Sequence, residues 1–468
     1  MSQSLPLPCT AAADGPARSV PSGTGTLVAT TIGSSLAFVL GSIVNVALPQ
    51  MQAAFDAGAT GAQWIVNAYL LPLGALVLIG GALGDHYGRR RVFQIGLLIF
   101  TASCALAAVA SSFPVFLAAR ALEGVGAALI APTSLAIIAD AFTGPARGRA
   151  VGTWAGAGAA AGALAPVAGG WIVDAAGWRW AFVAVIPFAV LAFVVAARAI
   201  RESVAETDDR APLDLVGAAL VGTGLLALIW GLVALPDRGT TGAVMAALGG
   251  GAALLAGFVA VEARKGDRAM TPLRLFRDAS FSGLTGFTFL LYAALGGLML
   301  ILPYVLISDQ GYSATQAGLA LLPFPLILGV LSRFTGGPLA DRYGARLLLT
   351  VGATLVAGGF AWFGLVPAEG VSYTADILPP LVVLALGMSL SVAPLTSAVL
   401  SSAGDRYAGV ASGINNAISR IGGLVATALL GLVLLGGDLM AGFALAAWTG
   451  AALALGSAAV AWLTVRPA

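Results

Sequence analysis

Charged side chains are scarce in this sequence: Asp, Glu, Lys and Arg make up only 9% of the 468 residues, whereas 59% are hydrophobic. A soluble globular chain carries about 25% charged residues. So few charges cannot cover the surface of a chain of this size in water. The scarcity therefore excludes a soluble globular protein and indicates that a lipid bilayer solvates much of the molecule.

Cysteine and histidine are nearly absent. The two cysteines, Cys9 and Cys104, lie in a polar tail and in an apolar run, and the single histidine, His86, lies in a charged loop. These residues cannot build a disulfide framework or a metal site, so we expect no metal and no cofactor. The net charge of +2 gives no basis for a nucleic-acid partner. A phosphate-binding loop and a nucleophile with a positioned base are also missing, so we assign no catalytic residues and expect no enzyme.

Apolar runs long enough to cross a bilayer follow one another along the chain. A spanning helix needs about 20 predominantly apolar residues. We expect fourteen spans, at residues 27–50, 62–83, 93–111, 115–139, 150–173, 180–200, 214–235, 243–262, 281–306, 314–339, 347–366, 377–401, 409–435 and 441–464. Residues 1–26 lack a basic segment followed by an apolar core, so we expect a disordered cytoplasmic tail and not a signal peptide. The sequence therefore predicts an all-α integral membrane protein.

The distribution of positive charge predicts the orientation in the membrane. With the N-terminus placed inside, 18 of the 23 Lys and Arg residues fall in cytoplasmic segments, and only Arg179 and Arg238 fall outside. Cytoplasmic loops carry an excess of Lys and Arg. We therefore expect a multi-pass protein of the cell (inner) membrane with both termini in the cytoplasm.

One loop pattern occurs twice. Residues 81–90 recur as residues 337–346, and every shared residue is offset by 256 positions. Gly88 and Gly344 permit a turn with positive φ between antiparallel helices, and the aspartate in each copy can pair with arginine or accept hydrogen bonds from a helix start. Duplicated loops in two parallel halves are typical of repeat-built transporters; a charged loop that only fixes topology is the alternative. The predicted gating-loop residues are Gly81, Asp85, Gly88, Arg90, Asp341, Gly344 and Arg346.

Several segments resemble the major facilitator superfamily, and in particular its fourteen-helix drug/proton antiporters. The loop at residues 81–91 resembles the superfamily signature between helices two and three. The other matching segments are residues 44–49 at the end of helix one, Gln63, Trp64 and Tyr69 in helix two, residues 120–126 in helix four, and residues 412–416 in helix thirteen. The resemblance covers nearly the whole chain but does not specify a substrate.

This resemblance implies a fold and a function. The expected parts are a tail at 1–26, a six-helix bundle at 27–205, an inserted, peripheral helix pair at 206–265 and a second six-helix bundle at 266–468. The implied function is secondary active efflux of small amphipathic molecules or drugs by alternating access, driven by protons, in a monomer. An uncoupled or differently coupled transporter of a specific metabolite or lipid, and a non-transporting membrane receptor, stay open as alternatives.

Arg120 and Glu123 form the predicted proton-coupling pair. A charge in the hydrocarbon costs at least about 2.5 kcal/mol on insertion scales, so it is a functional hypothesis by default. Glu123 follows Arg120 by three residues and lies on the same helix face. The resemblance gives Arg120 a role in tuning a nearby carboxylate during proton coupling. A static ion pair that only joins helices is the alternative.

The chain departs from these antiporters in helix one. They carry an aspartate five positions before the asparagine that corresponds to Asn45, whereas this sequence has Leu40. We expect that the coupling carboxylate has moved from helix one to Glu123 in helix four. Otherwise coupling is altered or lost, which leaves facilitated diffusion.

A polar group in the second half predicts a substrate cavity. Arg420 lies in the middle of a helix, close to Asn415 and Asn416. A purely structural hydrogen bond is the alternative for Arg420, and packing is the alternative for the aromatic residues. The predicted cavity residues are Asn45, Trp64, Asn67, Tyr292, Asn415, Asn416 and Arg420, and a kink in helix five is predicted at Gly162, Pro166 and Gly169.

Overall fold

The computed structural model describes residues 23–204, 213–266, 269, 271–335, 339–404, 407–433 and 438–466. Within these ranges the regular structure is helical and includes no strand. Thirteen helices of the described chain are long and apolar enough to cross a membrane, and α14, with 26 residues, occupies the position of the thirteenth expected span. The predicted all-α membrane fold is therefore confirmed.

The helices fall into a first bundle, an inserted pair and a second bundle. The first bundle contains α1 (Gly23–Ala54), α2 (Ala59–Tyr87), α3 (Arg89–Val109), α4 (Phe113–Ala141), α5 (Gly144–Ala176) and α6 (Trp178–Ala199). The inserted pair is α7 (Leu215–Arg238) and α8 (Gly242–Lys265). The second bundle contains α9 (Ala279–Ser308), α10 (Ala314–Leu321), α11 (Pro323–Phe334), α12 (Ala340–Phe363), α13 (Leu378–Ala403), α14 (Ala408–Val433) and α15 (Leu439–Thr464), with short helical turns η3 (Leu273–Arg277) and η5 (Tyr373–Ile377).

One expected boundary is wrong, and one expected span is interrupted. The tail predicted to reach residue 26 ends earlier, because α1 begins at Gly23 and the buried Thr26 hydroxyl donates to the carbonyl of Ala199 at 3.2 Å, which ties α1 to the end of α6; the rest of that tail lies outside the described residues. The span expected at 314–339 crosses as one segment, Ala314–Ser332. Its helix is interrupted between α10 and α11, because Pro323 and Pro325 lack the amide hydrogen that would continue it.

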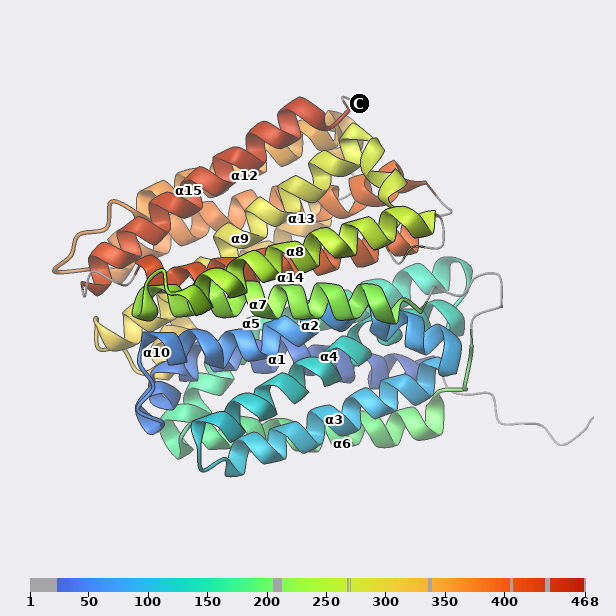
Figure 1. Cartoon of the computed structure of the whole chain (residues 1–468), viewed down its shortest axis with the longest axis horizontal. Coiled ribbons are helices and arrows are strands. Elements are labelled where there is room, and N and C mark those ends of the chain that lie inside the picture. The colour runs from blue at the N-terminus through green and yellow to red at the C-terminus, as the bar shows by residue number, and fades with distance from the viewer. Residues whose placement is uncertain are drawn as a thin grey trace, which may run out of the picture.

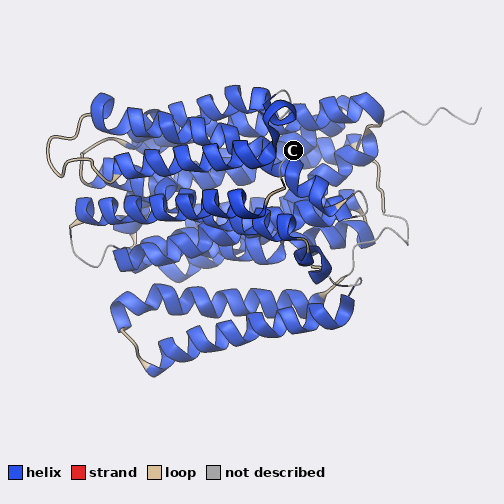
Figure 2. Ribbon diagram, turned by 90° about the horizontal axis from the view of Figure 1, so that it is seen from above, coloured by secondary structure: helices blue, strands red, loops and turns tan. Residues whose placement is uncertain are grey.

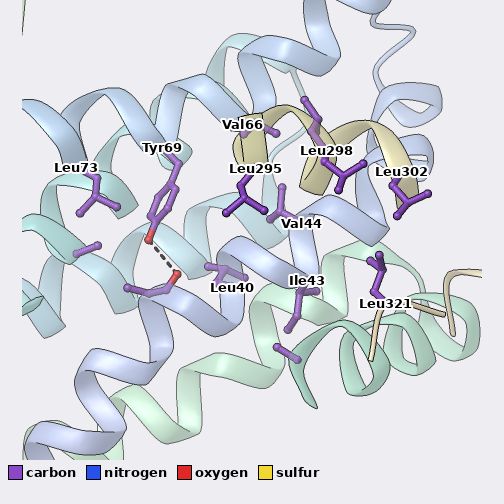
Figure 3. Close-up of a cluster of buried hydrophobic side chains, with 14 of the residues drawn as sticks. Leu40, Ile43, Val44, Val66, Tyr69, Leu73, Leu295, Leu298, Leu302 and Leu321 are labelled. Carbon is purple, nitrogen blue, oxygen red and sulfur yellow. Dashed lines mark hydrogen bonds between the residues drawn. The ribbon is translucent and has the colours of Figure 1, made fainter. Parts of the chain in front are cut away.

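The two bundles lie side by side and share one apolar cluster. In Figure 1 the first bundle, in blue and cyan, lies below the second, in yellow to red. Figure 3 shows Leu40 and Val44 of α1 close to Leu295 and Leu298 of α9, and all four side chains are buried. Because α1 belongs to one bundle and α9 to the other, apolar packing contributes directly to holding the bundles together.

The inserted pair covers the line along which the bundles meet. We call the contact of α2 with α14 the seam, because it joins one helix of each bundle. Helix α7 packs on both of these helices, and its Ile229 and Val233 form a buried cluster with Leu424 and Ala428 of α14. Helix α8 packs on α7, and Figure 2 shows the pair set to one side of the other helices. The pair is thus peripheral, yet α7 contacts both bundles.

Candidate functional site

The bundles are joined by hydrogen bonds at one end of the molecule. We call this end, where α5 finishes, the Asp174 end, and the opposite end, where α2 finishes, the Asp85 end. Asp174 accepts hydrogen bonds from the amides of Ala314 at 3.1 Å and Thr315 at 2.8 Å, and from the Thr315 hydroxyl at 2.5 Å. A carboxylate of the first bundle therefore caps the start of α10 in the second.

Two more contacts close the Asp174 end. The Gln63 amide nitrogen donates to the carbonyls of Thr427 and Ala428, each at 3.0 Å, across the seam. The Tyr304 hydroxyl donates to Gln52 Oε1 at 2.8 Å, which joins α9 to α1. In the part of the chain that the structure describes, the hydrogen bonds between the bundles lie at this end. The molecule is therefore closed at its Asp174 end.

Glycines allow α5 and α10 to cross closely near the Asp174 end. A Cβ atom at Gly170 would collide with the carbonyl of Ala314, and one at Gly318 would collide with the carbonyl of Pro166. Small residues let helix backbones approach in this way. In this arrangement, which is closed at the Asp174 end, the crossing requires glycine on both helices.

Of the three residues predicted to kink helix five, two contact neighbouring helices in the structure and one, Gly162, does not. Helix α5 runs from Gly144 to Ala176 and includes Pro166. A Cβ at Gly169 would collide with the Ile43 side chain of α1, whereas nothing lies within 4 Å of a Cβ at Gly162. The structure therefore places Pro166 and Gly169 in helix contacts and leaves Gly162 outside them.

Arg120 and Glu123 form an ion pair within α4 that is shielded from the surroundings. Their exposed fractions are 1% and 0%, and the Arg120 guanidinium donates to Glu123 Oε2. Arg120 Nε also donates to the carbonyl of Ile65 in α2 at 3.2 Å. The second carboxylate oxygen of Glu123 is buried and accepts no hydrogen bond from the described residues. The predicted pair thus exists in the structure, and it retains an open acceptor.

Tyr69 connects this ion pair to α1. The Arg120 guanidinium carbon lies 4.7 Å from the centroid of the Tyr69 ring, a cation–π distance. The Tyr69 hydroxyl donates to the carbonyl of Ala37 at 3.0 Å, the bond that Figure 3 draws as a dashed line. A movement of α1 relative to α4 would therefore act on Arg120 through this ring.

Leu40 occupies the position where an aspartate was expected from the resemblance. Its side chain is fully buried in the apolar cluster, and Figure 3 shows it between Tyr69 and Val44. A carboxylate at this position would lose its hydration and find apolar neighbours, which disfavours its charged form. The surroundings of residue 40 are therefore built for an apolar side chain.

Arg420 interacts with two of the other residues predicted to line the cavity, Asn416 and Tyr292. Its Nε donates to Asn416 Oδ1 at 3.1 Å, and its guanidinium carbon lies 5.9 Å from the centroid of the Phe38 ring in α1. Tyr292 interacts with its charge from α9. The neighbouring Asn415 Oδ1 accepts from the Thr288 hydroxyl at 2.6 Å, which fixes that amide against α9. The guanidinium therefore points across the seam toward the first bundle.

Other predicted cavity residues lie elsewhere. Trp64 packs on the apolar cluster that α7 and α14 form. Asn67 has an exposed fraction of 0%, and neither of its polar side-chain atoms has a partner among the described residues. Asn45 is partly buried in α1. The structure thus does not bring these three side chains into the hydrogen-bonded group of Arg420.

The first predicted gating loop, at residues 81–91, is held by the segment that follows α6. The backbone amides of Arg90 and Arg91 donate to the two carboxylate oxygens of Glu202 at 3.0 and 3.1 Å, and Arg90 Nη1 donates to the carbonyl of Ile200 at 3.1 Å. Gly88 has φ +107°, and a Cβ there would lie 2.5 Å from Glu202 Oε1. Its positive φ therefore favours glycine, and the absence of a Cβ lets the Glu202 carboxylate approach closely.

The other gating-loop residues have separate partners. Asp85 Oδ1 accepts hydrogen bonds from Arg89 at 3.0 and 3.2 Å, and Gly81 faces Pro132 of α4. In the second copy Gly344 also has positive φ, at +75°, and the Arg346 guanidinium carbon lies 4.2 Å from the Trp462 ring centroid. The side chain of the predicted Asp341 lies outside the described residues.

Three residues of these sites were not predicted from the sequence: Glu202, Asp174 and Phe38. Each makes its contact with a residue more than 80 positions away, namely with Arg90, Thr315 and Arg420. Pattern analysis of single helices carries no signal for such contacts. An acid just after an apolar span, as at Asp174 and Glu202, is the hint that the sequence offers for two of them.

Comparisons with known proteins agree on one family. The family model of the Major Facilitator Superfamily matches residues 30–427. The chain is 33% identical over 411 residues to the multidrug resistance protein Stp of Mycobacterium tuberculosis, covering 87% of this chain and 75% of Stp. It is 34% identical over 403 residues to the cephamycin export protein CmcT of Amycolatopsis lactamdurans, covering 83% of this chain and 80% of CmcT. The structure of an auto-inhibited POT family peptide transporter superposes with a TM-score of 0.72 at 18% identity, covering 96% of this chain and 99% of that one, which shows a shared fold.

Proposed function

The chain belongs to the major facilitator superfamily as an efflux-type secondary transporter, and from that premise we propose that proton entry through Glu123 drives its export of small molecules. The names of two similar proteins, a multidrug resistance protein and a cephamycin export protein, support small organic molecules as substrates. We further propose that it acts as a monomer in the cell membrane, with both termini in the cytoplasm.

The observation that carries this proposal is the environment of Glu123. It is fully buried, it is paired with Arg120, and one of its oxygens has no partner among the described residues. Loss of hydration favours the neutral carboxyl, whereas a nearby guanidinium favours the carboxylate. A conformational change that alters either effect changes the proton affinity, and a ligand can drive a transition only through such a difference.

A chain of contacts supports coupling between Glu123 and the substrate. Arg120 contacts the Tyr69 ring, Tyr69 binds the backbone of Ala37, and the next residue, Phe38, faces Arg420. The path therefore runs from the proposed proton site in α4 through α2 and α1 to α14. Substrate binding between the bundles would act on α1 and hence on the ion pair.

The arrangement of the bundles supports an inward-facing state. The Asp174 end is closed by hydrogen bonds between the bundles. The contacts that the loop at residues 81–91 makes with Glu202, and the contact between its Asp85 and Arg89, lie within the first bundle. The excess of Lys and Arg expected in cytoplasmic loops supports a cytoplasmic location for the Asp85 end. We propose that rocking of the bundles breaks the contacts at the Asp174 end and forms new ones at the Asp85 end.

Everted membrane vesicles test the proposed function. We expect vesicles that contain the protein to accumulate at least one of ethidium, rhodamine 123 and 5-carboxyfluorescein when respiration acidifies their interior, and a protonophore to abolish this accumulation. Accumulation that persists without a proton gradient would exclude proton coupling. Dye movement that only equalises concentrations would favour facilitated diffusion.

Asp85→Asn is expected to reduce transport about tenfold while leaving expression and thermal stability near those of the wild type. The pair with Arg89 is partly exposed, and such pairs contribute only about 0–1 kcal/mol to stability. In transport the lost charge matters more, because the loop has to exchange partners during the cycle. The measurement is initial dye uptake by everted vesicles, with the exposed Glu369→Gln as control. Equal uptake by Asp85→Asn and wild type would contradict a role for this loop in the cycle.

A further inference from the structure

Arg420 carries a charge that no acidic side chain neutralises within the described residues. Its hydrogen-bond partner is the neutral amide of Asn416, and the titratable groups that interact with it are Tyr69 and Tyr292, which are uncharged at neutral pH. The other arginine in the middle of a helix, Arg120, is paired with Glu123. A cation in the hydrocarbon region is costly without a counter-charge, so Arg420 lacks the counter-charge that Arg120 has.

An aromatic surface lies beside this charge. The Phe38 side chain is 48% exposed although its ring faces Arg420, and Asn416 is also exposed. Because Phe38 belongs to the first bundle and Arg420 to the second, the ring and the guanidinium meet between the two bundles. Among the described residues Arg420 donates one hydrogen bond, from Nε to Asn416, so its Nη donors remain for a ligand.

We propose that Arg420, Phe38 and Asn416 bind the anionic group and the adjacent ring of an aromatic organic anion, such as a carboxylate, as the transported substrate. This inference rests on the proposed export function and names its substrate class. The guanidinium pairs with the carboxylate in a bidentate manner, the Phe38 ring packs on the aromatic part of the ligand, and the Asn416 amide donates to a remaining acceptor. The substrate thus supplies the counter-charge that the protein omits.

Binding to the purified full chain in nanodiscs tests the substrate class separately from transport. The probes are 5-carboxyfluorescein, an anion, and rhodamine 123, a cation on the same xanthene scaffold, and the readout is fluorescence anisotropy. We expect saturable binding of 5-carboxyfluorescein, with Kd raised at least about tenfold by Arg420→Gln, because loss of even one of the two charge-assisted hydrogen bonds costs about that much. Arg420→Lys, which keeps the charge, should recover part of the affinity. Arg198→Gln, a matched change at an exposed arginine in the last turn of α6, should leave it unchanged.

Three results would overturn the inference. The first is a wild type that does not bind 5-carboxyfluorescein saturably, and the second is a wild type that prefers rhodamine 123. The third is an equal loss of binding affinity for both dyes in Arg420→Gln and in Arg420→Lys, which would show a structural role for Arg420. In each case proton-driven accumulation in the vesicle assay can still succeed, so the substrate class can fail while the export function stands.

Discussion

Glu123→Gln is expected to abolish substrate-driven proton movement while leaving counterflow exchange of substrate largely intact. Glutamine keeps the shape of the side chain and removes its titration. Counterflow needs only the conformational cycle with substrate bound, whereas net export driven by protons needs a group that binds and releases them. In proteoliposomes with an internal pH dye, the variant should therefore show no proton movement when a transported dye is added.

The matched control for this prediction is Glu262→Gln. Glu262 in α8 is also fully buried, but it accepts a hydrogen bond from the Thr271 amide and belongs to the peripheral pair. We expect Glu262→Gln to move protons like the wild type. If Glu123→Gln moves them equally well, Glu123 is not the coupling acid. If the wild type itself moves none, the transporter works by facilitated diffusion.

Returning an aspartate to helix one is not expected to rescue Glu123→Gln. Leu40 lies in the apolar cluster with an exposed fraction of 0%. The hypothesis that the carboxylate moved from helix one to helix four gains support from this packing, because residue 40 offers a carboxylate no polar partner there. Leu40→Asp should instead lower stability. Recovery of proton movement in the double variant, measured with the same pH dye, would contradict this expectation.

Gly170→Val is expected to shift the transporter away from the state closed at its Asp174 end and to reduce transport at least about tenfold. A side chain at this position collides with the backbone of Ala314 in α10, and overpacking typically costs about 1–3 kcal/mol. Because 1.4 kcal/mol changes an equilibrium about tenfold, the closed state should lose most of its population. Each bundle keeps its own core, so the protein should still fold.

Labelling at Asn67 measures this shift. Asn67 is fully buried in the closed state, so an Asn67→Cys variant in a Cys9→Ser, Cys104→Ala background should react slowly with a membrane-impermeant maleimide. We expect Gly170→Val to accelerate that reaction. Gly249→Val in α8, where nothing lies within 4 Å of the new Cβ, should change neither labelling nor transport. Unchanged labelling in Gly170→Val would show that this crossing does not control opening.

The membrane class, the helical spans and the duplicated loop are properties of the sequence by itself. A bilayer requires about 20 apolar residues per spanning helix, and backbone groups in lipid must be satisfied within the helix. Both requirements are local, so they can be recognised in a single segment. The same holds for the pairing of Arg120 with Glu123, because residues three apart lie on one helix face. The position of Gly88 between two helices likewise predicted its positive φ.

The tertiary structure decided which distant side chains meet these groups. Glu202 holds the first predicted gating loop, Tyr69 contacts Arg120, and Phe38 faces Arg420. These contacts depend on how helices pack against one another, and in lipid that packing is set by close fit and hydrogen bonds and not by a hydrophobic periodicity that a sequence displays. For the same reason only the structure showed that the molecule is closed at its Asp174 end. One sequence encodes every state of the transport cycle, and the contacts between the bundles identify the state.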